Sequence, residues 1–220
     1  METLITEICQ SLDAMPRKDA PSLHQVRRGW SEHFEDCSGA SVVAIAKRLV
    51  PIGLWERILA YEILAHHDGA LGMLTEKDVA VLGRGMASWG EVDCFACYVA
   101  GPAWRQGRIS GRVIHSWTRS SNRWWRRAAL VSTVALNSRA RGGQGDVVRT
   151  LGVCRQLIGD RDDMVVKALS WALRELSKRD QRAVKSFLCQ HSDTLAARVK
   201  REATNKLQTG LKNPRRGPAT

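Results

Sequence analysis

An almost unbroken succession of amphipathic helical patterns, with hardly any strand signal, constrains this sequence most. Val and Ile recur at helical spacing, aromatic residues make up only 6% of the chain, and short breaks containing Pro or Gly separate the segments. The pattern predicts an all-α fold. We expect helices over residues 3–14, 22–36, 41–49, 53–66, 76–86, 89–99, 109–118, 122–136, 146–158, 163–177, 181–190 and 194–208. One of the expected breaks between them is Gly101-Pro102.

A loose repeat of tryptophans runs through these segments. Trp55, Trp89 and Trp125 each stand near the start of a helix and are 34 and then 36 residues apart. This period favours an α-solenoid of antiparallel HEAT-like or armadillo-like helix pairs with a concave surface, and a compact helical bundle is the alternative. We expect one domain over residues 1–210, followed by a basic, flexible tail over 211–220.

Charge divides the chain into two unlike halves. The net charge is +12 and the pI about 10.0. Residues 1–110 have a net charge of −3 (11 Lys and Arg, 14 Asp and Glu), and residues 111–220 have +15 (23 against 8). A basic face of this kind is typical of a protein with a polyanionic partner. A generally basic protein is the alternative.

Other classes of protein find little support. No apolar run approaches the roughly 18 residues that cross a membrane, and the acidic N-terminus has no secretory signal pattern, so we expect a cytoplasmic protein. The six cysteines should then be reduced. Cys94 and Cys97 have CxxC spacing without a second pair or a nearby His, which favours core packing and predicts no metal site.

Three segments could carry chemistry, and the first is Ser88-Trp-Gly-Glu-Val-Asp93. Ser88 and Glu91 have the spacing of a capping box, which starts a helix at about Trp89. Trp89 and Asp93 are then i and i+4 on one helix face. The alternatives are an acidic residue that compensates the helix dipole and a tryptophan that anchors the helix by packing.

The other two segments are basic and contain tryptophan. Asn122-Arg-Trp-Trp-Arg-Arg127 places Arg123, Arg126, Arg127 and Trp125 within about one turn, which suits phosphate contacts and equally a solvated basic face. In Asp163–Lys178, Trp171 lies outside the apolar stripe Val165, Leu169, Ala172 and Leu176. Three cations flank it instead, Lys167, Arg174 and Lys178, which favours a contact with a nucleic-acid backbone over core packing.

Together, on a helical-repeat chain, these segments resemble the AlkD-like DNA alkylation-repair family, from about Val42 to Leu207. Trp89-Gly-Glu-Val-Asp93 looks like the family's catalytic Trp-x-x-x-Asp stretch. Arg127 stands where the family has a phosphate-binding arginine, and Trp171 where it has a second active-site tryptophan. The resemblance implies a HEAT-like DNA glycosylase that holds duplex DNA on its concave basic face and attacks the sugar without a tight base pocket.

The expected chemistry is simple. A purine alkylated at N3 or N7 is cationic and leaves as a neutral base, so no general acid is required. Asp93 can stabilise the positive charge that develops on the sugar and can place a water, and the indoles of Trp89 and Trp171 can face the cationic sugar.

The sequence therefore predicts a monomeric, cofactor-free glycosylase for N3- and N7-alkylated purines in duplex DNA. The predicted catalytic residues are Asp93, Trp89 and Trp171. The predicted DNA-binding residues are Arg127, Arg126, Arg123, Trp125, Lys167, Arg174 and Lys178. Two alternatives remain, a DNA-binding member of the family without catalysis and a helical scaffold for an acidic protein partner.

Overall fold

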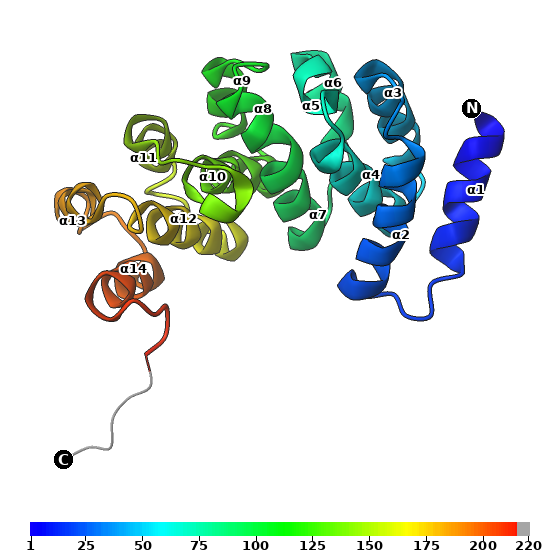
Figure 1. The fold of residues 1–220 in the computed structure, drawn as a ribbon. Helices are drawn as coiled ribbons and strands as arrows, with labels where there is room; N and C mark the ends of the chain where they lie inside the picture. The colour runs from blue at the N-terminus through cyan, green and yellow to red at the C-terminus, as the bar shows by residue number, and fades with distance from the viewer. Residues whose placement is uncertain (215–220) are drawn as a thin grey trace. The chain divides into compact units, whose positions relative to one another are not determined.

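The structure, a computed structural model, describes residues 1–214, and this part of the chain is helical with no strand (Figure 1). The predicted all-α class is therefore confirmed. The chain divides into two compact units, Met1–Ser110 and Gly111–Thr220. This boundary coincides with the change in charge, so the first unit has a net charge of −3 and the second +15.

The first unit is built around α4, whose side chains are buried on most of its circumference. Its helices are α1 (Glu2–Asp13), α2 (Ala20–His33), α3 (Gly39–Leu49), α4 (Leu54–His66), α5 (Ala70–Met73), α6 (Glu76–Leu82), α7 (Trp89–Cys94), the π-helix η1 (Phe95–Ala100) and α8 (Gly101–Arg105). Helix α4 packs against α1, α2, α3, α5, α7 and η1. Leu59, Ala60, Tyr61 and Leu64 are fully buried there, which makes α4 the support for the start of α7.

The predicted break at Gly101-Pro102 is wrong. The chain stays helical from α7 through η1 into α8, and Pro102 lies in the first turn of α8. Proline has no N–H, and in an α-helix its ring would clash with the carbonyl four residues earlier, here that of Tyr98. The wider π-turn of η1 lies directly before this point, so the backbone can pass Pro102 without ending the helix.

The second unit is built around α10 and α12, which pack against each other along their lengths. Its helices are α9 (Gly111–Trp117), α10 (Arg123–Asn137), the 3-10 helix η2 (Arg139–Arg141), α11 (Val147–Gln156), α12 (Asp163–Leu176), α13 (Gln181–Gln190) and α14 (Ala197–Thr209). The predicted stripe of α12 is buried: Val165, Leu169, Ala172 and Leu176 are all at most 2% exposed. Helix α14 covers another side of α12.

Smaller differences from the predicted helices have local causes. Helix α6 ends at Leu82 rather than at residue 86, because Gly83-Arg84-Gly85 follows and Gly85 has a φ of +77°. The short α5 and η2 had no periodic signal of their own. None of the helices within residues 1–214 is long and apolar enough to span a membrane. Of the predicted tail over 211–220, residues 215–220 lie outside the described residues.

Candidate functional site

The start of α7 presents Trp89 and Asp93 on one face, as the sequence predicts. Ser88 caps the helix, because its hydroxyl accepts a hydrogen bond from the Glu91 backbone N–H at 3.4 Å. The Trp89 side chain is 62% exposed, whereas Asp93 is partly buried. A tryptophan that anchors a helix loses most of its exposure on packing, so the exposure of Trp89 argues against the anchor alternative.

The capping box at this helix start is only half formed. Its Ser88 half is present, but the Glu91 carboxylate does not bind the Ser88 backbone N–H. Oε2 of Glu91 instead accepts hydrogen bonds from the Ala87 N–H at 3.1 Å and from the Ser88 hydroxyl at 2.7 Å. Its other oxygen, Oε1, lies 3.1 Å from Nε of Arg57 on α4. The carboxylate is therefore shared between the helix cap and a buried cation.

Sequence reasoning missed Arg57 entirely. It is only 7% exposed, and nothing in the periodicity of α4 distinguishes it from the solvated Arg and Lys residues of other helices. Its Nη1 donates to the Arg84 carbonyl at 2.9 Å and to the Tyr61 hydroxyl at 3.2 Å. The Tyr61 hydroxyl in turn donates to the Leu82 carbonyl at 2.7 Å. A buried polar network thus joins α4 to the start of α7 and to the loop before it.

In the second unit, the start of α10 carries the predicted cluster of arginines. Asn122 caps the helix through Oδ1, which accepts from the Trp124 N–H at 2.8 Å. Arg123 is the most open of the three, with its side chain 52% exposed and its guanidinium 4.9 Å from the centre of the Trp124 ring. It also lies 3.5 Å from the Asp162 carboxylate. This geometry leaves the Arg123 guanidinium accessible from solvent.

The side chains of Arg126 and Arg127 are instead largely buried. The Arg126 side chain is 19% exposed and forms an ion pair with Asp160, with 2.7 Å between Nε and Oδ2. Arg127 is 6% exposed, and its Nη1 donates to the Met164 carbonyl at 2.6 Å. Because Asp160 and Met164 flank the start of α12, these bonds hold the first turns of α10 and α12 side by side.

Trp125 stands on the same turn of α10 as this cluster. It is partly buried, and its ring centroid lies 4.8 Å from that of Trp117 at the end of α9. This tilted contact, with 47° between the two ring planes, joins α9 to α10.

Helix α12 places Trp171 partly exposed, with cations on the neighbouring turns. The Lys167 side chain is 43% exposed and lies 2.7 Å from Asp163, and that of Lys178 is 51% exposed and lies 2.7 Å from Glu175. Arg174 is more deeply placed, since its side chain is 17% exposed and its Nε donates to Ser170 Oγ at 3.2 Å. Burial lowers the pKa of Arg174 from its usual value, against the opposing effects of Glu202 and Glu175.

Glu202 on α14 is a second residue that the sequence did not point to. It is 4% exposed and accepts a hydrogen bond from Ser170 Oγ at 2.6 Å. Three cations surround it at 3.6–4.0 Å: Arg174, Arg198 and Lys212. This buried carboxylate ties α14 and the residues after it to the helix that carries Trp171.

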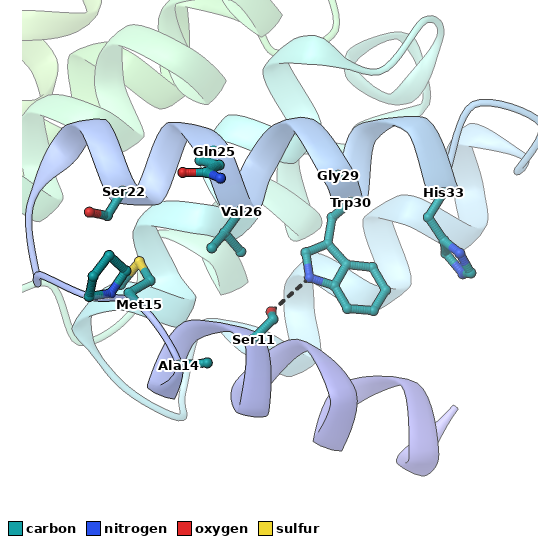
Figure 2. Close-up of a pocket in the computed structure, with 10 residues that line it drawn as sticks. Ser11, Ala14, Met15, Ser22, Gln25, Val26, Gly29, Trp30 and His33 are labelled. Carbon is teal, nitrogen blue, oxygen red and sulfur yellow. Dashed lines mark hydrogen bonds between the residues drawn. The ribbon is translucent and has the colours of Figure 1, made fainter.

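Two of the cavities among the described residues can be placed in the fold, and the predicted catalytic residues do not line either of these two. One of about 570 Å³ lies between α1 and α2, where Trp30 donates to Ser11 Oγ at 2.8 Å (Figure 2). The other, of about 390 Å³, lies at the C-terminal ends of α10 and α12 and includes Lys178 and Arg179 in its wall. Within residues 1–214, no group of three or more His, Cys, Asp or Glu side chains is placed to hold a metal ion.

Comparison with models of protein families identifies the family of this chain. A family model described as "DNA alkylation repair enzyme" matches residues 19–207, which is most of the chain and includes the starts of α7, α10 and α12. No curated protein matches the sequence.

Proposed function

The chain belongs to the DNA alkylation repair enzyme family, and we propose that it is a DNA glycosylase that excises N3- and N7-alkylated purines from duplex DNA. The observation that carries this proposal is the start of α7, where Trp89, a tryptophan that is 62% exposed, stands one turn from the Asp93 carboxylate. An exposed tryptophan beside a partly buried acid is poor packing and a suitable surface for a cationic sugar.

Asp93 is the proposed electrostatic catalyst. An alkylated purine carries its own positive charge, so it departs as a neutral base and needs no proton from the enzyme. As the glycosidic bond breaks, positive charge develops on the deoxyribose. The Asp93 carboxylate stabilises that charge and orients the water that attacks the sugar. The indole of Trp89, on the same face of α7, contributes the attraction of its ring quadrupole for the same charge.

The second unit is the proposed DNA-binding element, because it carries a net charge of +15. Arg123, Lys167 and Lys178 have the most exposed side chains among the predicted cations, and we assign direct phosphate contacts to them. Trp171 is the proposed second aromatic contact to the sugar. The remaining predicted residues are part of the same interface: Trp125, Arg126, Arg127 and Arg174.

The finer architecture belongs to the proposal as well. We propose that the helix pairs are HEAT-like repeats with a basic concave face that holds the duplex. The enzyme is proposed to act as a cytoplasmic monomer, and to attack the sugar without enclosing the base in a tight pocket.

The decisive experiment compares wild type with Asp93→Asn in release of free base from methylated duplex DNA at saturating enzyme. The amide keeps the size of the side chain but lacks its charge, so we expect the rate to fall about 10²–10³-fold, which corresponds to about 3–4 kcal/mol. DNA affinity should stay the same or rise, because a negative charge near phosphates is removed. Asp68→Asn is the matched control, since Asp68 is exposed in the loop after α4.

The outcomes separate the candidate functions. Release by wild type together with loss in Asp93→Asn supports the glycosylase. If Asp93→Asn retains more than about a third of the wild-type rate, Asp93 is not the catalytic carboxylate. A wild-type protein that binds duplex DNA and releases no base is a non-catalytic member of the family. One that binds no DNA at moderate salt is better explained as a scaffold for an acidic protein.

A further inference from the structure

Glu91 has an unusual place among the residues of α7. It lies between Trp89 and Asp93 in the sequence of this six-residue helix, yet its side chain is only 12% exposed and its carboxylate points toward Arg57. Both of its oxygens are used, one by the cap of α7 and the other by Arg57. Any contact that fixes Glu91 therefore also fixes the backbone that carries Trp89 and Asp93.

Arg57 supplies that contact from a second, well-buried helix. Its guanidinium bonds three separate parts of the first unit: Glu91 on α7, the Arg84 carbonyl in the loop before α7, and the Tyr61 hydroxyl on α4 itself. The planar fork of arginine sets the directions of these bonds, and a lysine cannot reproduce them. One buried side chain thus holds the start of α7, which Ser88 caps, against α4 and the loop before it.

The backbone after α7 makes such a contact important. In a regular α-helix, the ladder of i to i−4 hydrogen bonds would lock the rotation of α7 to that of α8. The π-helix η1 interrupts this ladder directly after Cys94. Because α7 contributes only six residues before the hydrogen-bonding pattern changes, its tertiary contacts take a larger part in setting its orientation.

A buried ion pair of this kind is a poor device for stability alone. The cost of removing two charges from water largely cancels their attraction, and apolar side chains of similar size often stabilise a core as well or better. Unlike apolar packing, the ion pair between Arg57 and Glu91 is directional, and it fixes the orientation of the groups that it joins. Catalysis depends on direction, since a displacement of about 1 Å at a catalytic group can cost on the order of 10²-fold in rate.

We propose that Arg57 is a positioning residue, which acts through Glu91 to fix the direction of Trp89 and Asp93 toward the substrate. This inference rests on the proposed function for its catalytic consequence and on the geometry of the first unit for its structural one.

The test uses Arg57→Lys and Glu91→Gln, which keep side chains of similar size. Lys47→Met is the matched control, because Lys47 and Asp78 form another ion pair in the first unit, at 2.7 Å, that joins α3 to α6 and does not involve α7. Three quantities are measured on the full chain: the affinity for methylated duplex, the rate of base release at saturating enzyme, and the ¹⁹F NMR line of Trp89 in protein labelled with 5-fluorotryptophan. Trp89→Phe assigns that line.

We expect Arg57→Lys and Glu91→Gln to lose about 10- to 100-fold in the rate of base release while their DNA affinity stays within about twofold of wild type. The Trp89 line should shift or broaden in both. Lys47→Met should keep the wild-type rate within about twofold and leave the Trp89 line in place. If either variant of the pair folds, keeps the Trp89 line and releases base at the wild-type rate, the positioning role is overturned.

The NMR readout keeps this inference separate from the proposed function. If wild type releases no base, the glycosylase proposal fails, and the Trp89 line still decides whether Arg57 positions α7. A line that moves in Glu91→Gln but not in Lys47→Met supports the positioning role. An unchanged line in both overturns it.

Discussion

Arg126 and Asp160 form a largely buried ion pair, with 2.7 Å between Nε and Oδ2, at the point where α10 and α12 begin. The same guanidinium donates to the carbonyls of Ser120 and Ser121, both at 3.0 Å. Arg123, three residues earlier, has a side chain that is 52% exposed. Arginines that look equivalent in the sequence therefore have different surroundings, and each can be tested by itself.

Arg123→Ala should weaken DNA binding without unfolding the protein. Arg123 contacts Asp162 at 3.5 Å, and the arginine side chain of this pair is 52% exposed. Losing the pair should therefore change the unfolding free energy by less than about 1 kcal/mol. Losing one phosphate contact should reduce the slope of log K against log salt by about 0.9. Titrations of duplex DNA at several salt concentrations measure this. A slope equal to that of wild type would remove Arg123 from the interface.

Arg126→Ala should, unlike Arg123→Ala, lower the stability of the protein clearly. It leaves the Asp160 carboxylate, whose side chain is 11% exposed, without its cation, which should cost about 2–3 kcal/mol of unfolding free energy. Urea unfolding of wild type, Arg126→Ala and Arg123→Ala compares the two positions directly. Equal unfolding midpoints for the two variants would contradict the structural difference between these arginines.

Arg127 combines both roles in our interpretation. The family resemblance implies a phosphate contact, and the structure shows a side chain that is 6% exposed and bonded to the Met164 carbonyl. We expect Arg127→Ala to lower the unfolding free energy by about 2 kcal/mol and also to reduce the salt slope by about 1. A lower stability with an unchanged slope would assign Arg127 to the packing of α10 against α12 alone.

Trp89→Ala should leave the unfolding free energy almost unchanged and should lower the rate of base release. A side chain that is 62% exposed contributes little to the core, so the unfolding free energy should change by no more than about 0.5 kcal/mol. The rate of base release should still fall, by less than in Asp93→Asn, because the indole supports the charge that Asp93 stabilises directly. Trp104→Ala, at a tryptophan that is 3% exposed, is the contrasting variant and should be strongly destabilising. Comparable melting temperatures for the two variants would mean that Trp89 is packed.

Periodicity and capping residues determine most of the helices, and they are local signals. The predicted segment over residues 181–190 coincides with α13, and several others differ from the observed helices by one or two residues. The continuation through Pro102 could not be predicted, because a proline normally ends a helix and nothing local announces the π-turn that relieves it. Periodicity also could not show where the chain divides, whereas the change of charge near residue 110 coincides with that division.

The candidate site was predicted in part for the same reason. Trp89 and Asp93 are four residues apart, so helical geometry alone places them together. Arg57 and Glu202 act through partners that are distant in sequence, and only the packing of α4 on α7 and of α14 on α12 reveals them. Their charge suggested solvated side chains, yet both are at most 7% exposed.

Tyr61 belongs to the network that supports α7. Its buried hydroxyl should make the unfolding free energy of the protein fall at alkaline pH. Burial raises the pKa of its hydroxyl from 10.0 to about 12, outweighing the opposite effect of Arg57. The unfolded chain releases this proton near pH 10, whereas the folded protein keeps it and donates it to the Leu82 carbonyl. Between these two values the unfolded state binds fewer protons, so the unfolding free energy falls as pH rises.

Tyr61→Phe tests this dependence, because phenylalanine has no proton to release. Below pH 10 the variant should be less stable than wild type by about 1 kcal/mol, for want of the hydrogen bond to Leu82. As the pH rises above 10, wild type should lose about 1.4 kcal/mol per pH unit more than the variant, so the two curves converge. Urea unfolding at pH 8, 10 and 11 under reducing conditions measures the difference. Tyr98→Phe, which removes the other tyrosine and leaves Tyr61 in place, should keep the loss seen in wild type. Parallel curves for wild type and Tyr61→Phe across this range would show that Tyr61 is not held protonated by burial.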